Sequence, residues 1–154
     1  MLDEHPDITP DRLELEIVES TAITDMNAAL EVLTACRALG VQLALDDFGT
    51  GYASLAYFRR LPVDLLKIDR SFVRDMLSDA DDRAIVLSVV HLAQAFDRRV
   101  IAEGVETTDH AQALIEIGCR LGQGYGIARP MPAAHIPGWI AWYSATDDGA
   151  AGRG

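Results

Sequence analysis

The sequence has little cysteine, few aromatic residues and no leader-like start. Its 154 residues include two cysteines, and aromatic side chains make up 6% of the chain. Cys36 and Cys119 do not form the close pairs of a zinc site, so we expect two buried, reduced thiols in a cytosolic protein. The first residues, Met-Leu-Asp-Glu-His-Pro, lack the basic and apolar regions of a signal peptide.

Positive charge and long apolar runs are also scarce. Thirteen Lys and Arg residues stand against 24 Asp and Glu residues, a formal net charge of −11. This balance argues against DNA and anionic membranes as partners. No run approaches the roughly 20 apolar residues of a membrane span, since the longest candidate, residues 84–96, contains Ser88, His91 and Gln94. The remaining composition, 49% apolar and 24% charged, is that of a globular protein.

The length suits one domain but falls short of the roughly 250 residues usual for a closed (β/α)₈ barrel. Short β-like runs alternate with amphipathic helical runs, which predicts an α/β fold with a parallel sheet and crossover helices. The predicted strands cover residues 13–18, 41–46, 64–69, 99–103 and 119–125, and the predicted helices cover residues 25–39, 81–97, 108–117 and 133–143. Residues 144–154 have no periodicity and are predicted to be a disordered tail.

Polar residues gather where the predicted strands end. A strand buried on both faces should be apolar, yet four of these strands break that rule near their carboxyl ends. Such ends meet at one edge of a parallel sheet, where ligands bind. The alternative is that individual residues are helix caps, solvated acids or partners of arginine. The residues concerned are Glu16, Glu19, Asp46, Asp47, Lys67, Asp69, Glu103, Glu106 and Gln123.

Converging carboxylates repel one another and must take up protons or bind cations. Mg²⁺ or Mn²⁺ is the natural partner of an oxygen-only ligand set. A pair of such ions can clamp the attacking and leaving oxygens of a phosphodiester. Lys67 could pair a carboxylate, orient water or stabilise developing negative charge; the alternative is an ordinary structural ion pair.

The ordered motifs of this chain resemble those of the EAL domain family, bacterial phosphodiesterases that cleave cyclic di-GMP to the linear dinucleotide. The resemblance runs from about residue 8 to residue 143 and rests on five motifs in order. They are Leu13-Glu14-Leu15-Glu16-Ile17-Val18-Glu19-Ser20, Asp46-Asp47-Phe48-Gly49-Thr50-Gly51-Tyr52, Leu66-Lys67-Ile68-Asp69, Ile101-Ala102-Glu103-Gly104-Val105-Glu106-Thr107, and Gln123-Gly124-Tyr125 with Arg129-Pro130.

The resemblance implies roles for the central acidic residues. It implies that Glu16, Asp46, Asp47 and Glu103 are metal ligands, with Asp46 bridging two ions of Mg²⁺ or Mn²⁺. It further implies that Lys67 and Glu103 are catalytic and help hold and activate the attacking water, with Glu103 the better candidate for general base or metal contact.

The resemblance also implies a supporting set around them. Glu19 would anchor the loop of residues 47–54. Glu106 and Gln123 would support the site, and Asp69 would be structural or near the ligand. In the family, the Asp-Phe-Gly loop and the helix after the Lys67 strand form a dimer contact, so a homodimer is one expectation.

The chain departs from the family pattern because the motifs of the N-terminal part of the domain are missing. The name-giving Glu-Ala-Leu segment, with a metal-binding Glu and a substrate-contacting Arg, has no counterpart here, and an Asn ligand of a later strand is missing too. We therefore expect a partial EAL domain over residues 1–143, a TIM-barrel type truncated to about five of the eight βα units. Such a piece would have two open edges and would associate with a copy of itself or with a missing N-terminal segment.

Three other interpretations remain open. The chain could be a non-catalytic module for cyclic di-GMP binding or for regulation and dimerisation, a fragment that does not fold alone, or another Mg²⁺-dependent barrel enzyme acting on a phosphorylated metabolite. Among the remaining residues, we expect His110 and His135 to be exposed. Trp139, Trp142 and Tyr143 are interpreted as packing residues of the last helix.

Overall fold

A five-stranded parallel sheet forms the centre of the computed structural model, which describes residues 5–20, 25–50 and 55–150. The strands follow one another in sequence order across the sheet. They are β1 (Glu14–Val18), β2 (Gln42–Phe48), β3 (Leu65–Ile68), β4 (Arg99–Glu103) and β5 (Leu121–Gln123). Each strand of the prediction is present, and the parallel pairing brings all five carboxyl ends to one edge.

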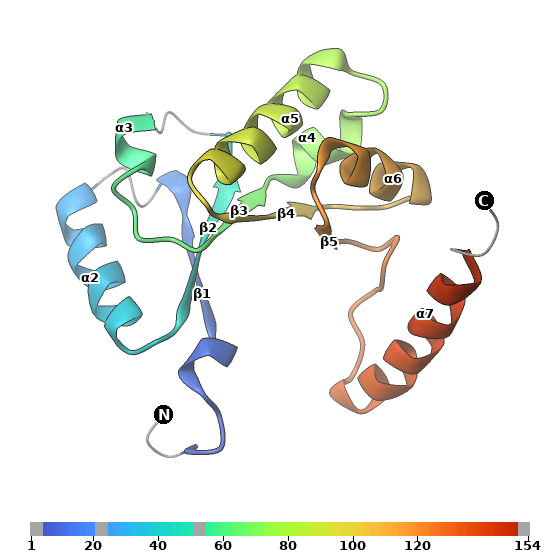
Figure 1. The fold of residues 1–154 in the computed structure, drawn as a ribbon, viewed down its shortest axis with the longest axis horizontal. Helices are drawn as coiled ribbons and strands as arrows, with labels where there is room; N and C mark the ends of the chain where they lie inside the picture. Colours follow the sequence, from blue (N-terminus) through green and yellow to red (C-terminus); the bar gives the residue numbers. More distant parts are fainter. Residues whose placement is uncertain (1–4, 21–24, 51–54, 151–154) are drawn as a thin grey trace.

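Helices connect the strands and gather along one side of the sheet, apart from the last helix (Figure 1). The helices are α2 (Met26–Ala38), α3 (Leu55–Phe58), α4 (Arg70–Asp75), α5 (Ala80–Ala95), α6 (Thr108–Ile117) and α7 (Ile136–Ala150), with 3₁₀ turns η2 (Pro10–Arg12) and η3 (Ala133–His135). A crossover helix between neighbouring parallel strands is the repeating unit of a (β/α) barrel, here present in part.

Capping residues explain where the predicted helices begin and end. The carboxylate of Asp25 accepts a hydrogen bond from the backbone of Ala28, and Asp79 caps α5 in the same way. Thr107 caps α6, which ends at Gly118 in the left-handed region with φ of 99°. These local signals place three of the helices within two residues of the sequence prediction.

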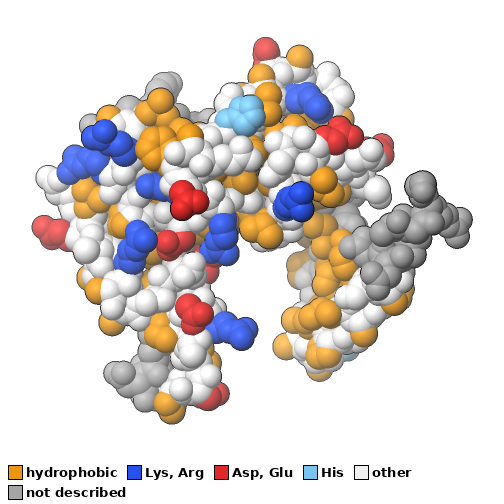
Figure 2. Space-filling model, in the orientation of Figure 1, with side chains coloured by type: hydrophobic (Ala, Val, Ile, Leu, Met, Phe, Trp, Pro, Cys, Tyr) orange, Lys and Arg blue, Asp and Glu red, His pale blue; other side chains and the backbone are white. Residues whose placement is uncertain are grey.

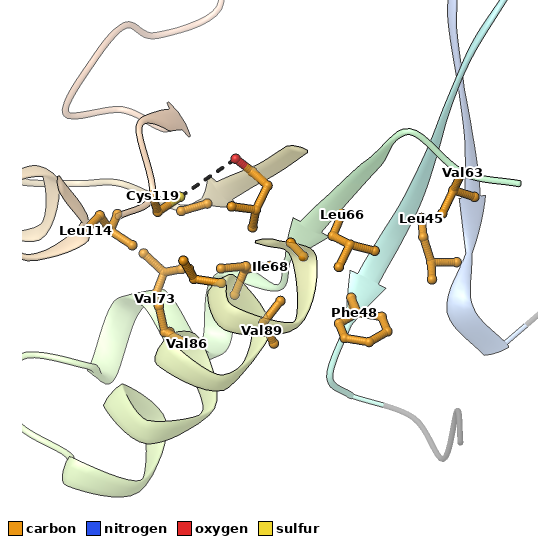
Figure 3. Packing of buried hydrophobic residues seen from close by; sticks show 14 of the residues in the cluster. Leu45, Phe48, Val63, Leu66, Ile68, Val73, Val86, Val89, Leu114 and Cys119 are labelled. Carbon is orange, nitrogen blue, oxygen red and sulfur yellow. Dashed lines mark hydrogen bonds between the residues drawn. The ribbon is translucent and has the colours of Figure 1, made fainter. Parts of the chain in front are cut away.

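The hydrophobic core lies between the sheet and the helices that cover it. Ile68 of β3 lies next to Val73 of α4 and Val86 of α5, and Leu66 of β3 and Leu45 of β2 continue the same core (Figure 3). Each of these five side chains is fully buried. Their removal from water is the main favourable term that holds the helices on the sheet.

The last helix is much more exposed than the others. It continues to Ala150, into the segment 144–154 for which the sequence predicts disorder, while residues 151–154 lie outside the described part. Two of its aromatic residues pack on each other, since Trp139 stacks on Tyr143 with ring centroids 5.0 Å apart. Tyr143 also lines a hollow with Ala111 and Ile115 of α6. Trp142 is 61% exposed. Figure 2 shows apolar side chains of α7 beside an open space, and the N-terminal part of the chain that leads into β1 lies on the other side of this space (Figure 1).

Candidate metal centre

A β-bulge at the end of β2 places two consecutive aspartates near the same site. Leu45 pairs with Leu66 and Phe48 with Ile68, so three residue steps on β2 oppose two on β3. Asp47 within this bulge has φ of 54°. In a regular strand Asp46 and Asp47 would point to opposite faces, but a bulge re-aims one of them.

Three carboxylates gather at this bulge. One oxygen each from Asp46, Asp47 and Glu103 lie within 4.8 Å of one another, and all three residues are half-buried. Asp46 and Asp47 come from β2 and Glu103 from the end of β4, with β3 between them. The convergence that the polar strand ends predict is therefore present for these three residues.

Lys67 of β3 lies between the carboxylates of its neighbours. Its Nζ atom is 2.8 Å from Glu16 Oε1, 3.0 Å from Asp46 Oδ1 and 2.8 Å from Glu103 Oε1. The Lys67 side chain is 7% exposed, whereas the Glu16 side chain is 47% exposed. Glu16 thus reaches the ammonium group and is not part of the three-carboxylate group.

The pKa values at the site follow from burial and from these neighbours. Burial opposes the charged form of Lys67, but hydrogen bonds to Glu103, Glu16 and Asp46 outweigh it and raise the Lys67 pKa. Burial raises the pKa of Asp47, and the charges of Asp46, Asp69 and Glu103 raise it further. Lys67 is therefore a cation at neutral pH, and one cation does not balance the surrounding acids.

Glu19 and Asp69 hold the loops beside the centre. Glu19 is 2% exposed, and its carboxylate accepts a hydrogen bond of 2.9 Å from the backbone of Gly49. This contact ties Glu19 to the loop that the resemblance assigns to it, although residues 51–54 of that loop lie outside the described residues. Asp69 caps α4 through Ser71, whose backbone and hydroxyl both donate to it.

Glu106 and Gln123 lie at a pocket beside the centre. Gln123 pairs with Glu103 across β4 and β5. The pocket has a volume of about 290 Å³ and shares Glu103 with the metal centre. It is lined by Arg70, Glu103, Gly104, Glu106, Gln123, Gly124 and Tyr125.

The structure places two residues in surroundings that the sequence did not predict. Arg70, at the start of α4, lines the pocket, and its position after Asp69 was the one available signal. His110 was expected to be exposed, and this is wrong, since it is 8% exposed and its Nε2 lies 3.1 Å from the backbone carbonyl oxygen of Arg74 in α4. A lone histidine on a predicted helix carries no local signal of burial.

The donor set fits a hard divalent cation. All three clustered groups are carboxylates, and their spacing suits oxygen ligands around one Mg²⁺ or Mn²⁺ ion. Lys67 contacts one oxygen of Asp46 and one of Glu103, so the second oxygen of each is the natural ligand. A cation would also relieve the repulsion that raises the Asp47 pKa.

Comparison with known proteins points to one family. The EAL domain family model matches residues 1–130. The bifunctional diguanylate cyclase/cyclic di-GMP phosphodiesterase MucR of Pseudomonas aeruginosa is 44% identical over 134 residues, which are 87% of this chain and 20% of MucR. The solved structure of the PaMucR phosphodiesterase in complex with c-di-GMP matches with a TM-score of 0.84 and 44% identity, covering 88% of this chain and 54% of that one.

A second solved structure holds a metal. The Klebsiella pneumoniae BlrP1 manganese/cy-diGMP complex matches with a TM-score of 0.75 and 39% identity, covering 80% of this chain and 32% of that one. The chain thus spans a fifth of the length of MucR and about half of the solved PaMucR chain. No helix in the described ranges is long and apolar enough to cross a bilayer.

Proposed function

Because this chain belongs to the EAL domain family, we propose that it is part of a metal-dependent cyclic di-GMP phosphodiesterase that hydrolyses the cyclic dinucleotide to the linear one. The observation that carries the proposal is the joint placement of Asp46, Asp47 and Glu103 beside the buried ammonium of Lys67. Relatives of similar sequence are named as phosphodiesterases of this nucleotide.

The metal ligands in this proposal are Asp46, Asp47 and Glu103, joined by Glu16 at the edge of the centre. When bound, Mg²⁺ or Mn²⁺ would supply Lewis-acid stabilisation of the charge that develops on the phosphodiester. The finer assignments, two ions and a bridging role for Asp46, belong to the same proposal. A surplus of carboxylates over the single lysine supports binding of more than one positive charge.

Lys67 and Glu103 take different parts in the chemistry. The raised pKa of Lys67 keeps the ammonium protonated at neutral pH, so Lys67 donates hydrogen bonds and cannot act as a general base. Glu103 remains as the carboxylate that accepts a proton from the attacking water, and its side chain is 18% exposed. The ammonium 2.8 Å away keeps the Glu103 carboxylate oriented.

The surrounding residues shape the site. Glu19 holds Gly49 and the end of β2, and Asp69 fixes the start of α4. Glu106 and Gln123 flank the pocket beside Glu103, where part of the nucleotide would lie. Cyclic di-GMP is the partner in this proposal, and a cytoplasmic location goes with it. A homodimer, or association with an N-terminal segment, would cover the open edges.

A second function is favoured by a specific observation. Glu16 sits on β1, an outer strand of the sheet, and its side chain is 47% exposed. A centre so open to water at one edge suits a module that binds cyclic di-GMP or another chain without cleaving the nucleotide. The two functions share a ligand and differ in whether product appears.

The test is hydrolysis of cyclic di-GMP by this 154-residue chain with Mn²⁺ or Mg²⁺, with the linear product separated by chromatography. Asp46→Asn is the matched control, because it keeps the side-chain size and removes the charge. Metal-dependent product that disappears in Asp46→Asn supports the phosphodiesterase. Nucleotide binding by calorimetry without product supports the binding module, and a folded chain that neither binds nor cleaves contradicts both.

A further inference from the structure

His110 is a buried polar side chain that the proposed chemistry does not use. It lies in the first turn of α6, directly after the loop of residues 104–107 that follows Glu103. Its 8% exposure places the imidazole among packed atoms, where each ring nitrogen needs a partner. Both nitrogens have one.

The imidazole joins two helices in a defined tautomer. Nε2 lies 3.1 Å from the backbone carbonyl oxygen of Arg74, in the last turn of α4. A carbonyl only accepts, so Nε2 carries the proton and donates it. Nδ1, 2.7 Å from Thr107 Oγ1, then accepts from the Thr107 hydroxyl. That oxygen also accepts from the backbone of His110 at 3.3 Å, which closes the first turn of α6.

The loop between Glu103 and His110 is closely packed on two sides. A Cβ on Gly104 would lie 2.7 Å from Arg70 Cβ, so the loop abuts the start of α4. On its other side, a Cβ on Gly124 would lie 2.2 Å from the carbonyl oxygen of Val105. The backbone of Val105 also donates to Gln123 at 3.0 Å. The two ends of α4 therefore meet the loop at Gly104 and, through His110, at Thr107.

We propose that His110 is a positioning residue for the metal centre. By tying the start of α6 to the end of α4, it holds the loop of residues 104–107 in place and sets where Glu103 and Glu106 stand relative to Arg70 across the pocket. The inference rests on the proposed function, because it assigns His110 to the support of that same site. The ring of His110 bonds to Thr107 and Arg74, neither of which lines the pocket.

Three variants of the full chain test this. His110→Ala removes both ring contacts. His110→Gln restores one, because its amide can donate to the Arg74 carbonyl as Nε2 does. His135→Ala is the matched control, since His135 is an exposed histidine in η3. Two quantities are measured for each: amide hydrogen exchange in residues 104–107, and the Kd for Mn²⁺ by calorimetry.

We expect His110→Ala to speed exchange in residues 104–107 about tenfold, the factor that one or two lost hydrogen bonds produce, while exchange in β2 and β3 stays unchanged. We expect its Kd for Mn²⁺ to rise about threefold to tenfold, at or below the range for residues that orient metal ligands. His110→Gln should recover part of both effects, and His135→Ala should match the wild type.

Two results would overturn the proposal. One is faster exchange spread evenly over the sheet in His110→Ala, which would mean a loss of global stability only. The other is an unchanged Kd for Mn²⁺ in folded His110→Ala. Failure of the wild-type chain to bind Mn²⁺ would count against the metal centre itself, and loop exchange alone would then decide whether His110 positions the loop.

Discussion

Lys67 is the one lysine of the sequence, and it stands where charge must be balanced. Its ammonium contacts carboxylates from β1, β2 and β4, the strands on both sides of its own. A buried ammonium without such partners would be strongly destabilising, and so would the clustered carboxylates without a cation. Lys67 therefore holds the carboxyl ends of four strands together.

Asp69 gives a residue-level prediction about acid stability. Burial disfavours its charged form, but hydrogen bonds from Ser71 outweigh this and hold the Asp69 pKa below its usual range. Between the folded and unfolded pKa values, the unfolded chain binds more protons. Asp69 thus contributes stability that is complete above the unfolded pKa and is lost as pH falls through the folded pKa.

We expect Asp69→Asn, which keeps a capping side chain, to remove this contribution. The free energy of unfolding, measured by urea denaturation without metal, should then fall less steeply in the variant as pH drops below about 4. Equal slopes for variant and wild type would contradict the assigned pKa direction.

At the scale of elements, the segment after β5 packs directly on the loop after β4. The backbone of Gly126 donates to the carbonyl of Val105 at 2.9 Å, and that of Val105 donates to Gln123 at 3.0 Å. Residue 124 is in closest contact, since an added Cβ would overlap the Val105 backbone. Glycine is required at position 124 because the two backbones are in contact there, and not because of a left-handed φ angle.

We expect Gly124→Ala to lower the free energy of unfolding by about 2 kcal/mol or more, as overpacking against backbone does. Gly138→Ala is the control, because nothing lies within 4 Å of its added Cβ in α7. That variant should raise the free energy by no more than about 1 kcal/mol. Urea denaturation measures both, and similar losses at the two positions would disprove the close approach.

At the scale of the whole molecule, the sheet has two outer strands and a poorly covered end. Among the described residues, β1 pairs only with β2, and β5 only with β4. Exposed apolar side chains lie on the last helix, including Ile140 at 51% and Trp142 at 61%. Open strand edges and apolar patches are sites of association.

We therefore expect the isolated chain to self-associate, with a sedimentation coefficient that rises with protein concentration. Replacing both Ile140 and Trp142 by lysine should weaken this association, because each change puts a charge on the exposed face of α7. Leu77→Lys is the control, because Leu77 is an exposed apolar residue between α4 and α5. This variant should associate as strongly as the wild type. A monomer at every concentration would contradict the expectation.

Much of the fold and part of the site could be predicted from sequence alone. Alternating periodicities located all five strands, and caps such as Asp25, Thr107 and Gly118 located helix ends. The polar strand ends pointed to Asp46, Lys67 and Glu103 as neighbours. These properties are local, or follow from the rule that parallel strands end at one edge.

Other features depended on contacts between distant residues. The bulge that turns Asp46 and Asp47 to one site exists only through pairing of β2 with β3. Glu16 meets an ammonium two strands away, and His110 is buried because a carbonyl of α4 lies opposite it. The sequence by itself determined which residues end each strand and each helix. Tertiary structure decided which of those residues meet, because packing between elements sets distances that no local pattern contains.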